Sequence, residues 1–299
     1  EFPAEAGRYH LYVTYSCPFA CRALAALHFK GLEDVVSVSV GHPIFQKTRP
    51  SDPSDAHCGW AFADPAREAT ITGFNGKQYS TDGCVPDTVN NATYVRDIYE
   101  LVNKEPRPYN VPLLWDKKTQ TIVNNESADI LRIFNTGFRG LTSSKVDLLP
   151  EDLADEIEAM NANLVADIDA GVLKVMFAPD EDVRQQALAD YFTHKIQAAD
   201  ELLAKTRFLV GDEVTEADIR VFHSLVRFDV NQRKGDAFNL NQYPNLVNYL
   251  RDLYQTPAIN KSVEWEHLKH VLTNYHFPVL ASDPFIDYEA AHDRATRFA

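Results

Sequence analysis

Two cysteines lie where a predicted strand runs into a predicted helix, in the sequence LYVTYSCPFACRAL at residues 11–24. Cys17 stands at the start of that helix, where unsatisfied backbone N–H groups and the positive end of the helix dipole favour a thiolate over a thiol. Pro18 suits the first helical turn because that position needs no N–H group. A small buried side chain is the alternative, since cysteine is among the most buried residue types. The placement at this junction favours a reactive nucleophile at Cys17.

Cys21 lies one turn further along the same predicted helix, where the dipole is weaker. Its spacing from Cys17 is one residue longer than that of the redox dithiol pattern. We interpret Cys21 as a packed core residue, with a resolving thiol as the alternative. If Cys17 works alone, the second thiol of a redox cycle must come from another molecule, and a small soluble thiol is the simplest source.

Metal and nucleotide cofactors have little support in the sequence. Four cysteines in 299 residues are too few for a disulfide scaffold, which favours thiols in a reducing compartment. Zinc is the competing idea because His57 adjoins Cys58, but a structural zinc site usually shows two close-spaced ligand pairs. No Gly-rich phosphate-binding motif is present either. We therefore expect neither a metal nor a nucleotide.

The chain is acidic, with a formal net charge of −14 from 43 acidic and 29 basic residues. Such a surface repels phosphate backbones and anionic lipid heads. No apolar run reaches the ~20 residues that span a bilayer, and residues 1–10 have neither a basic start nor an apolar middle. We expect no nucleic-acid or membrane partner and a cytoplasmic location, with organellar import left open because the start of the natural chain is unknown.

Strand and helix patterns alternate in the first part of the chain. Residues 9–15 and 35–40 are β-rich and flank an apolar helical pattern over 18–29. This order predicts two parallel strands joined by a right-handed crossover. Two short apolar runs at 111–116 and 121–125 surround a polar turn and predict an antiparallel hairpin.

A long segment without periodicity interrupts this pattern. Residues 41–92 are rich in Gly, Pro, Asp, Ser and Thr and predict an irregular insertion. Such a loop in a compact domain is usually functional. Helical patterns follow at 92–103 and at 126–135. Together these elements predict an α/β domain over residues 1–140.

Only helical patterns follow residue 150. Thr215 and Asp218 form a variant of the capping box, in which a hydroxyl N-cap is followed three residues later by a carboxylate, and they predict the start of a buried helix. We expect an all-α domain over 150–278 and a surface tail over 279–299. The predicted helices of this domain cover residues 151–170, 181–205, 216–228 and 244–255.

Two dipeptides suit a small thiol peptide as ligand. Pro112 follows Val111 between two strand patterns, where an ordinary edge-strand proline and a cis peptide bond both fit. A cis bond would turn the Val111 backbone toward an extended peptide. Glu126 and Ser127 at a helix start offer a carboxylate for an ammonium group, and a hydroxyl with backbone N–H groups for a carboxylate. Simple helix capping is the alternative interpretation.

Several runs resemble the xi class of glutathione transferases, also called glutathionyl-hydroquinone reductases. They include GRYHLYVTYSCPFACRAL, VPLLWDKKTQTIVNNES and FLVGDEVTEADIR, and the resemblance covers about residues 5–276. It implies a thioredoxin-like α/β N-terminal domain followed by an all-α C-terminal domain, the glutathione transferase fold. It also implies glutathione as co-substrate, a small organic electrophile or conjugate as second substrate, and a homodimer.

The resemblance also implies roles for single residues. Cys17, in CPFA where the family usually has CPWA, would be the nucleophile. Trp60 in GWAF would pack its indole over glutathione, with a core tryptophan as the alternative. The remaining implied glutathione contacts are the backbone of Val111 before a cis Pro112, and the γ-glutamyl site formed by Glu126 and Ser127.

The sequence departs from the family where the second substrate would bind. Family members usually carry three tyrosines there, but the matching motifs GVLK, RFDVNQ and HLKHVL have Leu173, Gln232 and Leu272 in their place. Without the phenolic hydroxyls, a pocket loses much of its preference for a hydroquinone oxygen. We therefore expect a retained glutathione site beside a changed second-substrate pocket. The residues expected in that pocket are Phe19, Leu173, Gln232 and Leu272.

Three functions fit these residues. The favoured one is a glutathione-dependent thiol transferase or reductase, which removes glutathione from a small glutathionyl conjugate of the hydroquinone type or a related one through a Cys17 mixed disulfide. The second is a transferase, dehalogenase or lyase in which glutathione attacks a more apolar substrate. The third is a protein that binds glutathione conjugates without turnover.

Overall fold

The computed structural model describes residues 2–231, 238–270, 273–274 and 284–299. The chain divides into two compact units. The first unit comprises Glu1–Val146 and Ser262–Pro278, and the second comprises Asp147–Lys261 and Val279–Ala299. These units differ from the predicted domains near the C-terminus, because Ser262–Pro278 belongs to the α/β unit and not to the helical one.

A mixed four-stranded sheet forms the centre of the first unit, in the order β2-β1-β7-β8. The parallel β1–β2 pair and the antiparallel β7–β8 hairpin are the pairings predicted from the sequence. β1 joins them by pairing antiparallel with β7, so Leu11 lies opposite both Val38 and Leu114. The strands are β1 (Tyr9–Val13), β2 (Val36–Val40), β7 (Leu113–Asp116) and β8 (Thr121–Asn124).

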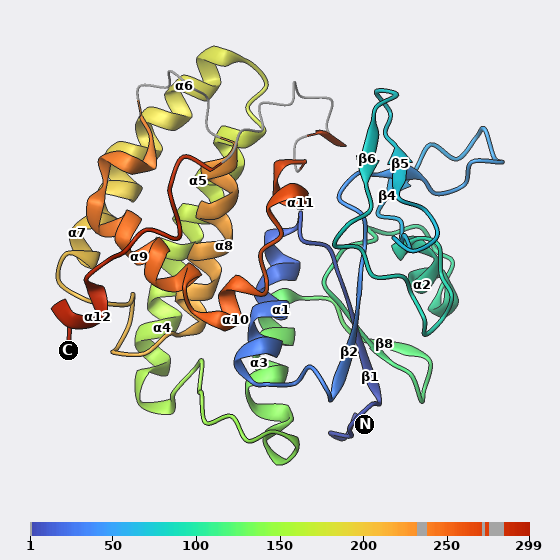
Figure 1. The fold of residues 1–299 in the computed structure, drawn as a ribbon, viewed down its shortest axis with the longest axis horizontal. Helices are drawn as coiled ribbons and strands as arrows, with labels where there is room; N and C mark the ends of the chain where they lie inside the picture. Colours follow the sequence, from blue (N-terminus) through green and yellow to red (C-terminus); the bar gives the residue numbers. More distant parts are fainter. Residues whose placement is uncertain (1, 232–237, 271–272, 275–283) are drawn as a thin grey trace. The chain divides into compact units, whose positions relative to one another are not determined.

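Three helices cover this sheet. Helices α1 (Pro18–Phe29) and α3 (Ser127–Gly137) pack together on one face, while α2 (Val95–Val102) packs against β8 on the other (Figure 1). Leu27 of α1 and Phe134 of α3 are completely buried. Gly31 ends the first helix region with φ +59°, a left-handed conformation that glycine adopts without a steric penalty. The start of α1, at Pro18, lies a few residues after the end of β1 at Val13.

The insertion over 41–92 is more regular than predicted. It contains two small antiparallel sheets, and isolated bridges join Gly41 to Phe62 and Ala61 to Tyr94. Strands of two or three residues are too short to produce a detectable alternation of apolar and polar side chains, which is why the sequence predicted only loop. The strands are β3 (Gln46–Lys47), β4 (Cys58–Gly59), β5 (Thr70–Thr72) and β6 (Gln78–Ser80).

Ser262–Pro278 contributes α11 (Trp265–Lys269) to the first unit. The Asn274 side chain accepts a hydrogen bond from the Phe45 N–H at 2.7 Å and donates one to the Pro43 carbonyl at 2.7 Å. His267 Nε2 donates to the Asp82 carbonyl at 2.8 Å. These bonds reach residues about 200 positions earlier, which local sequence patterns cannot reveal.

The second unit is helical. Its α8 is buried along almost its whole length and begins at the predicted capping box, in which the Asp218 carboxylate accepts the Thr215 N–H at 2.8 Å. Among the described residues, no helix is long and apolar enough to cross a membrane. Its helices are α4 (Ala154–Met160), α5 (Ala166–Met176), α6 (Glu181–Asp190), α7 (Gln197–Leu203), α8 (Glu216–Val230), α9 (Pro244–Tyr254), α10 (Pro257–Asn260) and α12 (Arg294–Arg297).

Shorter turns connect these helices. The π-helical stretches η3 (Asn161–Val165) and η4 (Tyr191–Ile196) interrupt the two long helices predicted from the sequence. Gly171 permits this packing, because a Cβ atom there would lie 2.1 Å from the Tyr191 ring. The 3₁₀ turns with described bounds include η1 (Arg139–Leu141), η2 (Glu151–Leu153) and η5 (Leu240–Gln242).

The C-terminal segment is not the surface tail that the sequence predicted, as far as it is described. Ile286 and Tyr288 are buried, and Arg294 is only 1% exposed. The Arg294 guanidinium donates hydrogen bonds to the carbonyls of Leu203 at 3.1 Å and Thr206 at 2.6 Å. Sparse anchors of this kind hold a segment without giving it any periodicity.

Candidate active site

Cys17 occupies the start of α1, as predicted. It is the N-cap residue, in extended conformation with φ −92° and ψ 118°, and its carbonyl accepts the Cys21 N–H at 3.2 Å. The side chain is partly exposed. Its Sγ lies 3.5 Å from the carbonyl oxygen of Val111, within reach of a thiol hydrogen bond. Cys17 therefore combines access to solvent with the N-terminal end of a helix, where a thiolate is favoured.

The other cysteines have different surroundings, and no disulfide links any of the four. Cys21 is completely buried, and its thiol lies 3.5 Å from the Tyr15 carbonyl oxygen, which agrees with a packed core residue. Burial raises the pKa of Cys84 to about 12. The pKa of Cys58 is also raised, mainly by burial. Both thiols are thus held in their protonated form at neutral pH.

The suggested zinc pair does not form a ligand cluster. Nδ1 of His57 lies 2.9 Å from the Thr48 hydroxyl. Cys58 Sγ donates to the Ala56 carbonyl at 3.6 Å. Across the described ranges, no group of three His, Cys, Asp or Glu side chains is arranged to hold a metal ion.

Val111 and Pro112 are joined by a cis peptide bond, one of the two conformations that the sequence left open. Val111 itself is 4% exposed and lies two residues before the start of β7. The segment therefore brings the Val111 carbonyl to the Cys17 sulfur from 94 residues away. A cysteine and a backbone segment suited to bind an extended peptide lie together at this point.

Glu126 is the N-cap residue of α3, and its carbonyl accepts the Ile130 N–H at 2.9 Å. Its side chain is exposed and makes no capping hydrogen bond to the described residues. The Glu126 N–H instead donates to the Asn124 side chain at 2.6 Å. Simple capping does not explain the Glu126 carboxylate, which is open to a ligand, and Ser127 begins the helix beside it.

Trp60 lies between β4 and the bridge from Ala61 to Tyr94. Its ring meets the Phe45 ring edge-to-face, with centroids 5.0 Å apart. The indole Nε1 is buried and has no hydrogen-bond partner among the residues that the structure describes. The Trp60 side chain as a whole is only partly buried, so part of its ring remains available to a ligand.

The predicted second-substrate residues are only partly described. Phe19 of α1 is 38% exposed, and the Arg22 guanidinium carbon lies 4.8 Å from the centre of its ring. Leu173 of α5 is 43% exposed in the second unit. Gln232 and Leu272 lie outside the described residues. The predicted pocket therefore stays a prediction.

The sequence analysis missed residues that hydrogen-bond to segments of the predicted glutathione site. Tyr99 of α2 donates its hydroxyl hydrogen to the Asn110 carbonyl at 2.9 Å and accepts a hydrogen bond from Asn125 Nδ2 at 3.1 Å. Asn274 holds the segment that carries Phe45. The available signal was a tyrosine on the buried face of an amphipathic helix, since a buried phenol usually finds a hydrogen-bond partner.

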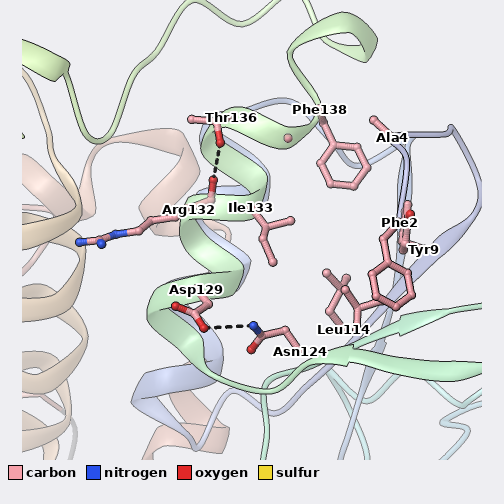
Figure 2. A pocket seen from close by; sticks show the side chains of 12 residues that line it. Phe2, Ala4, Tyr9, Leu114, Asn124, Asp129, Arg132, Ile133, Thr136 and Phe138 are labelled. Carbon is pink, nitrogen blue, oxygen red and sulfur yellow. Dashed lines mark hydrogen bonds between the residues drawn. The ribbon is translucent and has the colours of Figure 1, made fainter.

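A separate cavity of about 540 Å³ lies beside α3 in the same unit (Figure 2). Figure 2 shows Phe2, Ile133 and Phe138 along its apolar walls. Asn124 donates to Asp129 at 3.1 Å at its polar end, and the Arg132 side chain points away from it. None of the residues predicted for the glutathione site lines this cavity.

A mixed thioredoxin-like sheet, a cysteine at the first helix and a cis proline before β7 define a thiol-peptide-binding protein of the glutathione transferase class. Residues 16–136 match the sequence model of a family described as "Glutathione S-transferase, N-terminal domain". Residues 182–252 match "Glutathione S-transferase, C-terminal domain".

Comparison with individual proteins shows which group within this class the chain is similar to. The chain is 34% identical to "Glutathionyl-hydroquinone reductase YqjG" of Escherichia coli, over 99% of this chain and 85% of the relative. It is 32% identical to "Glutathionyl-hydroquinone reductase PcpF" of Sphingobium chlorophenolicum, over 90% and 78%. The solved xi-class structure from Natrialba magadii is 36% identical with a TM-score of 0.83, over 99% and 85%. Glutathione-bound YqjG is 33% identical with a TM-score of 0.84, over 99% and 91%.

The protein therefore belongs to the xi class of the glutathione transferase family, as its sequence motifs predicted.

Proposed function

We propose that the protein removes glutathione from a small glutathionyl conjugate, of the hydroquinone type or a related one, through a mixed disulfide at Cys17. The observation that carries this proposal is the position of Cys17, partly exposed at the start of α1 with its sulfur 3.5 Å from the carbonyl before cis Pro112. Two relatives named glutathionyl-hydroquinone reductases support it.

In the first step, the Cys17 thiolate attacks the sulfur of the conjugate. A disulfide forms between Cys17 and glutathione while the bond from sulfur to the ring carbon breaks. The electron pair of that bond stays on the carbon, which takes up a proton and leaves as the free hydroquinone. The carbon is reduced, and the two sulfurs are oxidised to the level of a disulfide.

In the second step, a glutathione thiolate attacks the glutathione sulfur of the mixed disulfide. Oxidised glutathione leaves and the Cys17 thiolate returns. Glutathione thus supplies the two electrons that the first step consumed. A single cysteine is sufficient for this cycle, in keeping with the buried position of Cys21.

The glutathione half of the conjugate would be held within the first unit. The exposed Glu126 carboxylate suits the ammonium group of the γ-glutamyl end, and the N-terminus of α3 at Ser127 suits its carboxylate. The Val111 backbone before cis Pro112 would pair with the peptide, and the Trp60 indole would pack over glutathione.

A residue expected in the second-substrate pocket supports an alternative function within the same family. Leu173, at a position where the family usually has tyrosine, exposes 43% of an apolar side chain. This feature favours a less polar substrate, as a transferase, dehalogenase or lyase would use. The homodimer and the cytoplasmic location stay predictions.

The test uses the full chain with a glutathionyl-hydroquinone and glutathione. We expect one free hydroquinone and one oxidised glutathione per turnover, and mass spectrometry should detect glutathione bound to Cys17 when the second thiol is withheld. Cys17→Ser should lose activity at least ~100-fold, while Cys58→Ser should keep it. Full activity in Cys17→Ser would contradict the mixed disulfide and favour the transferase alternative. Binding of the conjugate without consumption of glutathione would favour a carrier.

A further inference from the structure

Helix α2 contacts all three segments that carry the proposed glutathione contacts. At its N-terminus, the Val95 N–H donates to the Trp60 carbonyl at 3.1 Å. In the middle of the helix, the Tyr99 hydroxyl donates to the Asn110 carbonyl and accepts from the Asn125 side chain. Asn110 directly precedes Val111, and Asn125 directly precedes Glu126. One phenol therefore connects the two loops that would bind opposite parts of the same peptide.

We infer that Tyr99 is a positioning residue for glutathione, whose hydroxyl fixes the Val111 segment and the start of α3 at the spacing that an extended glutathione requires. This inference rests on the proposed function. Tyr99 would not touch the ligand itself and would act through Asn110 and Asn125. Its loss should therefore weaken glutathione binding more than it slows the chemistry at Cys17.

The hydroxyl is well suited to hold two loops. Tyr99 is 2% exposed, so water does not compete for its hydrogen bonds. Burial raises the pKa of Tyr99, which keeps the hydroxyl protonated and able to donate at any working pH. Its single hydrogen goes to the Asn110 carbonyl, and its oxygen remains to accept from Asn125. Both roles of the hydroxyl are used.

The helix that carries Tyr99 is itself anchored to the insertion. Arg49 Nη1 lies 2.8 Å from the Asp97 carboxylate, and Arg96 Nη1 lies 2.5 Å from the Asp55 carboxylate. These charged pairs, all partly buried, hold α2 in place independently of Tyr99. Removal of the Tyr99 hydroxyl should therefore release the two loops without displacing the helix.

Tyr12 provides a matched control in the same unit. Its hydroxyl also donates once, to Asp87 Oδ1 at 3.0 Å, and accepts once, from Asn90 Nδ2 at 2.9 Å. Tyr12 is completely buried. Its partners lie in a segment that carries none of the residues assigned to glutathione. Tyr12→Phe should therefore lose similar hydrogen bonds and thermal stability while leaving glutathione binding unchanged.

The experiment compares Tyr99→Phe with Tyr12→Phe and the unmodified full chain. Isothermal titration calorimetry measures the Kd of glutathione, and steady-state kinetics measure KM and kcat with a glutathionyl-hydroquinone. We expect Tyr99→Phe to raise Kd and KM about three- to tenfold, the loss expected for one or two hydrogen bonds, with kcat changed less than about twofold. Tyr12→Phe should leave all three constants within about twofold.

A second variant separates positioning from a general loss of packing. Asn125→Ala removes one partner of the Tyr99 hydroxyl and should raise Kd by a similar factor. In the double variant, the Kd of glutathione should be at most about twofold higher than in the single variant that binds glutathione less tightly. Both changes break the same connection, so their effects should not multiply. Equal effects of Tyr99→Phe and Tyr12→Phe on Kd, or fully multiplicative effects in the double variant, would overturn the inference alone. An unmodified chain that binds no glutathione would overturn the proposed function as well.

Discussion

The reactivity of single thiols is the first property that the site makes measurable. Cys17 and Cys58 are both partly exposed, yet only Cys17 lies at the N-terminal end of a helix. The pKa of Cys58 is raised, mainly by burial. Because the thiolate is the reacting species, we expect substoichiometric iodoacetamide at pH 7 to modify Cys17 at least ~10-fold faster than Cys58. Peptide mapping by mass spectrometry measures both rates in one sample.

Cys58 is thus an internal control, and the buried Cys21 and Cys84 should remain unmodified in the folded chain. Equal rates at Cys17 and Cys58 would show that the helix N-terminus does not activate the sulfur. Slower modification of Cys17 in the presence of glutathione would in addition place the peptide over it.

For single residues, the sequence predicted the features that depend on neighbouring residues along the chain. Cys17 before Pro18 marks a helix start, and the structure confirms that position. Whether the bond before Pro112 was cis remained open, because both isomers suit a proline between strands. Tyr99 could not be assigned, since its two partners come from loops 11 and 26 residues away. Such a role exists only once the loops have been brought together by the fold.

The start of helix α8 is held by one buried side chain. Asp218 is completely buried and accepts hydrogen bonds from the Leu209 N–H at 2.9 Å, the Thr215 N–H at 2.8 Å and the Tyr249 hydroxyl at 2.8 Å. Asp218→Ala leaves these donors buried without an acceptor, so the free energy of unfolding should fall by about 3 kcal/mol or more. Urea denaturation measures this change.

The matched control is Asp180, the exposed N-cap of α6 in the same unit, whose side chain accepts one N–H. Asp180→Ala should lower the free energy of unfolding by only about 1 kcal/mol. A similar loss in both variants would mean that Asp218 contributes no more than an ordinary surface cap.

Elements with a clear local signal were predicted correctly, as the crossover around α1, the β7–β8 hairpin and the capping box at the start of α8 show. The errors fall where the pattern is short or the contacts are remote. The two-residue strands β3 and β4 are below the length at which alternation can be seen. The buried C-terminal segment depends on Arg294, which binds carbonyls 88 and 91 residues away.

For the whole molecule, buried histidines link folding to pH. His10 and His267 are 1% and 2% exposed, and burial lowers the pKa of each to about 4. Ser39 donates its hydroxyl hydrogen to the Pro86 carbonyl, so His10 Nε2 donates to the Ser39 oxygen at 2.9 Å while Nδ1 lies 2.7 Å from the Ser37 hydroxyl. These bonds are satisfied by a neutral imidazole.

The unfolded chain binds protons at these histidines near their ordinary pKa of about 6.5, whereas the folded chain does not bind them until about pH 4. Stability is therefore fully present above pH 6.5 and is lost as the pH falls from 6.5 towards 4. Each histidine should lower the free energy of unfolding by about 1 kcal/mol when the pH falls from 7.5 to 5.5. Asp116 adds to the loss only below about pH 4, because its hydrogen bonds, first of all to Arg8, hold its pKa well below its usual range.

The measurement is the free energy of unfolding in urea at pH 7.5 and pH 5.5, for the unmodified chain, His10→Gln and His194→Gln. We expect His10→Gln to lower stability at pH 7.5 but to reduce the difference between the two pH values by about 1 kcal/mol, because one of the titrating groups is gone. His194→Gln, at an exposed residue of η4, is the control for the replacement of a histidine as such. A pH dependence in His10→Gln equal to that of the unmodified chain would show that His10 binds protons alike in the folded and unfolded chain and that other groups cause the acid sensitivity.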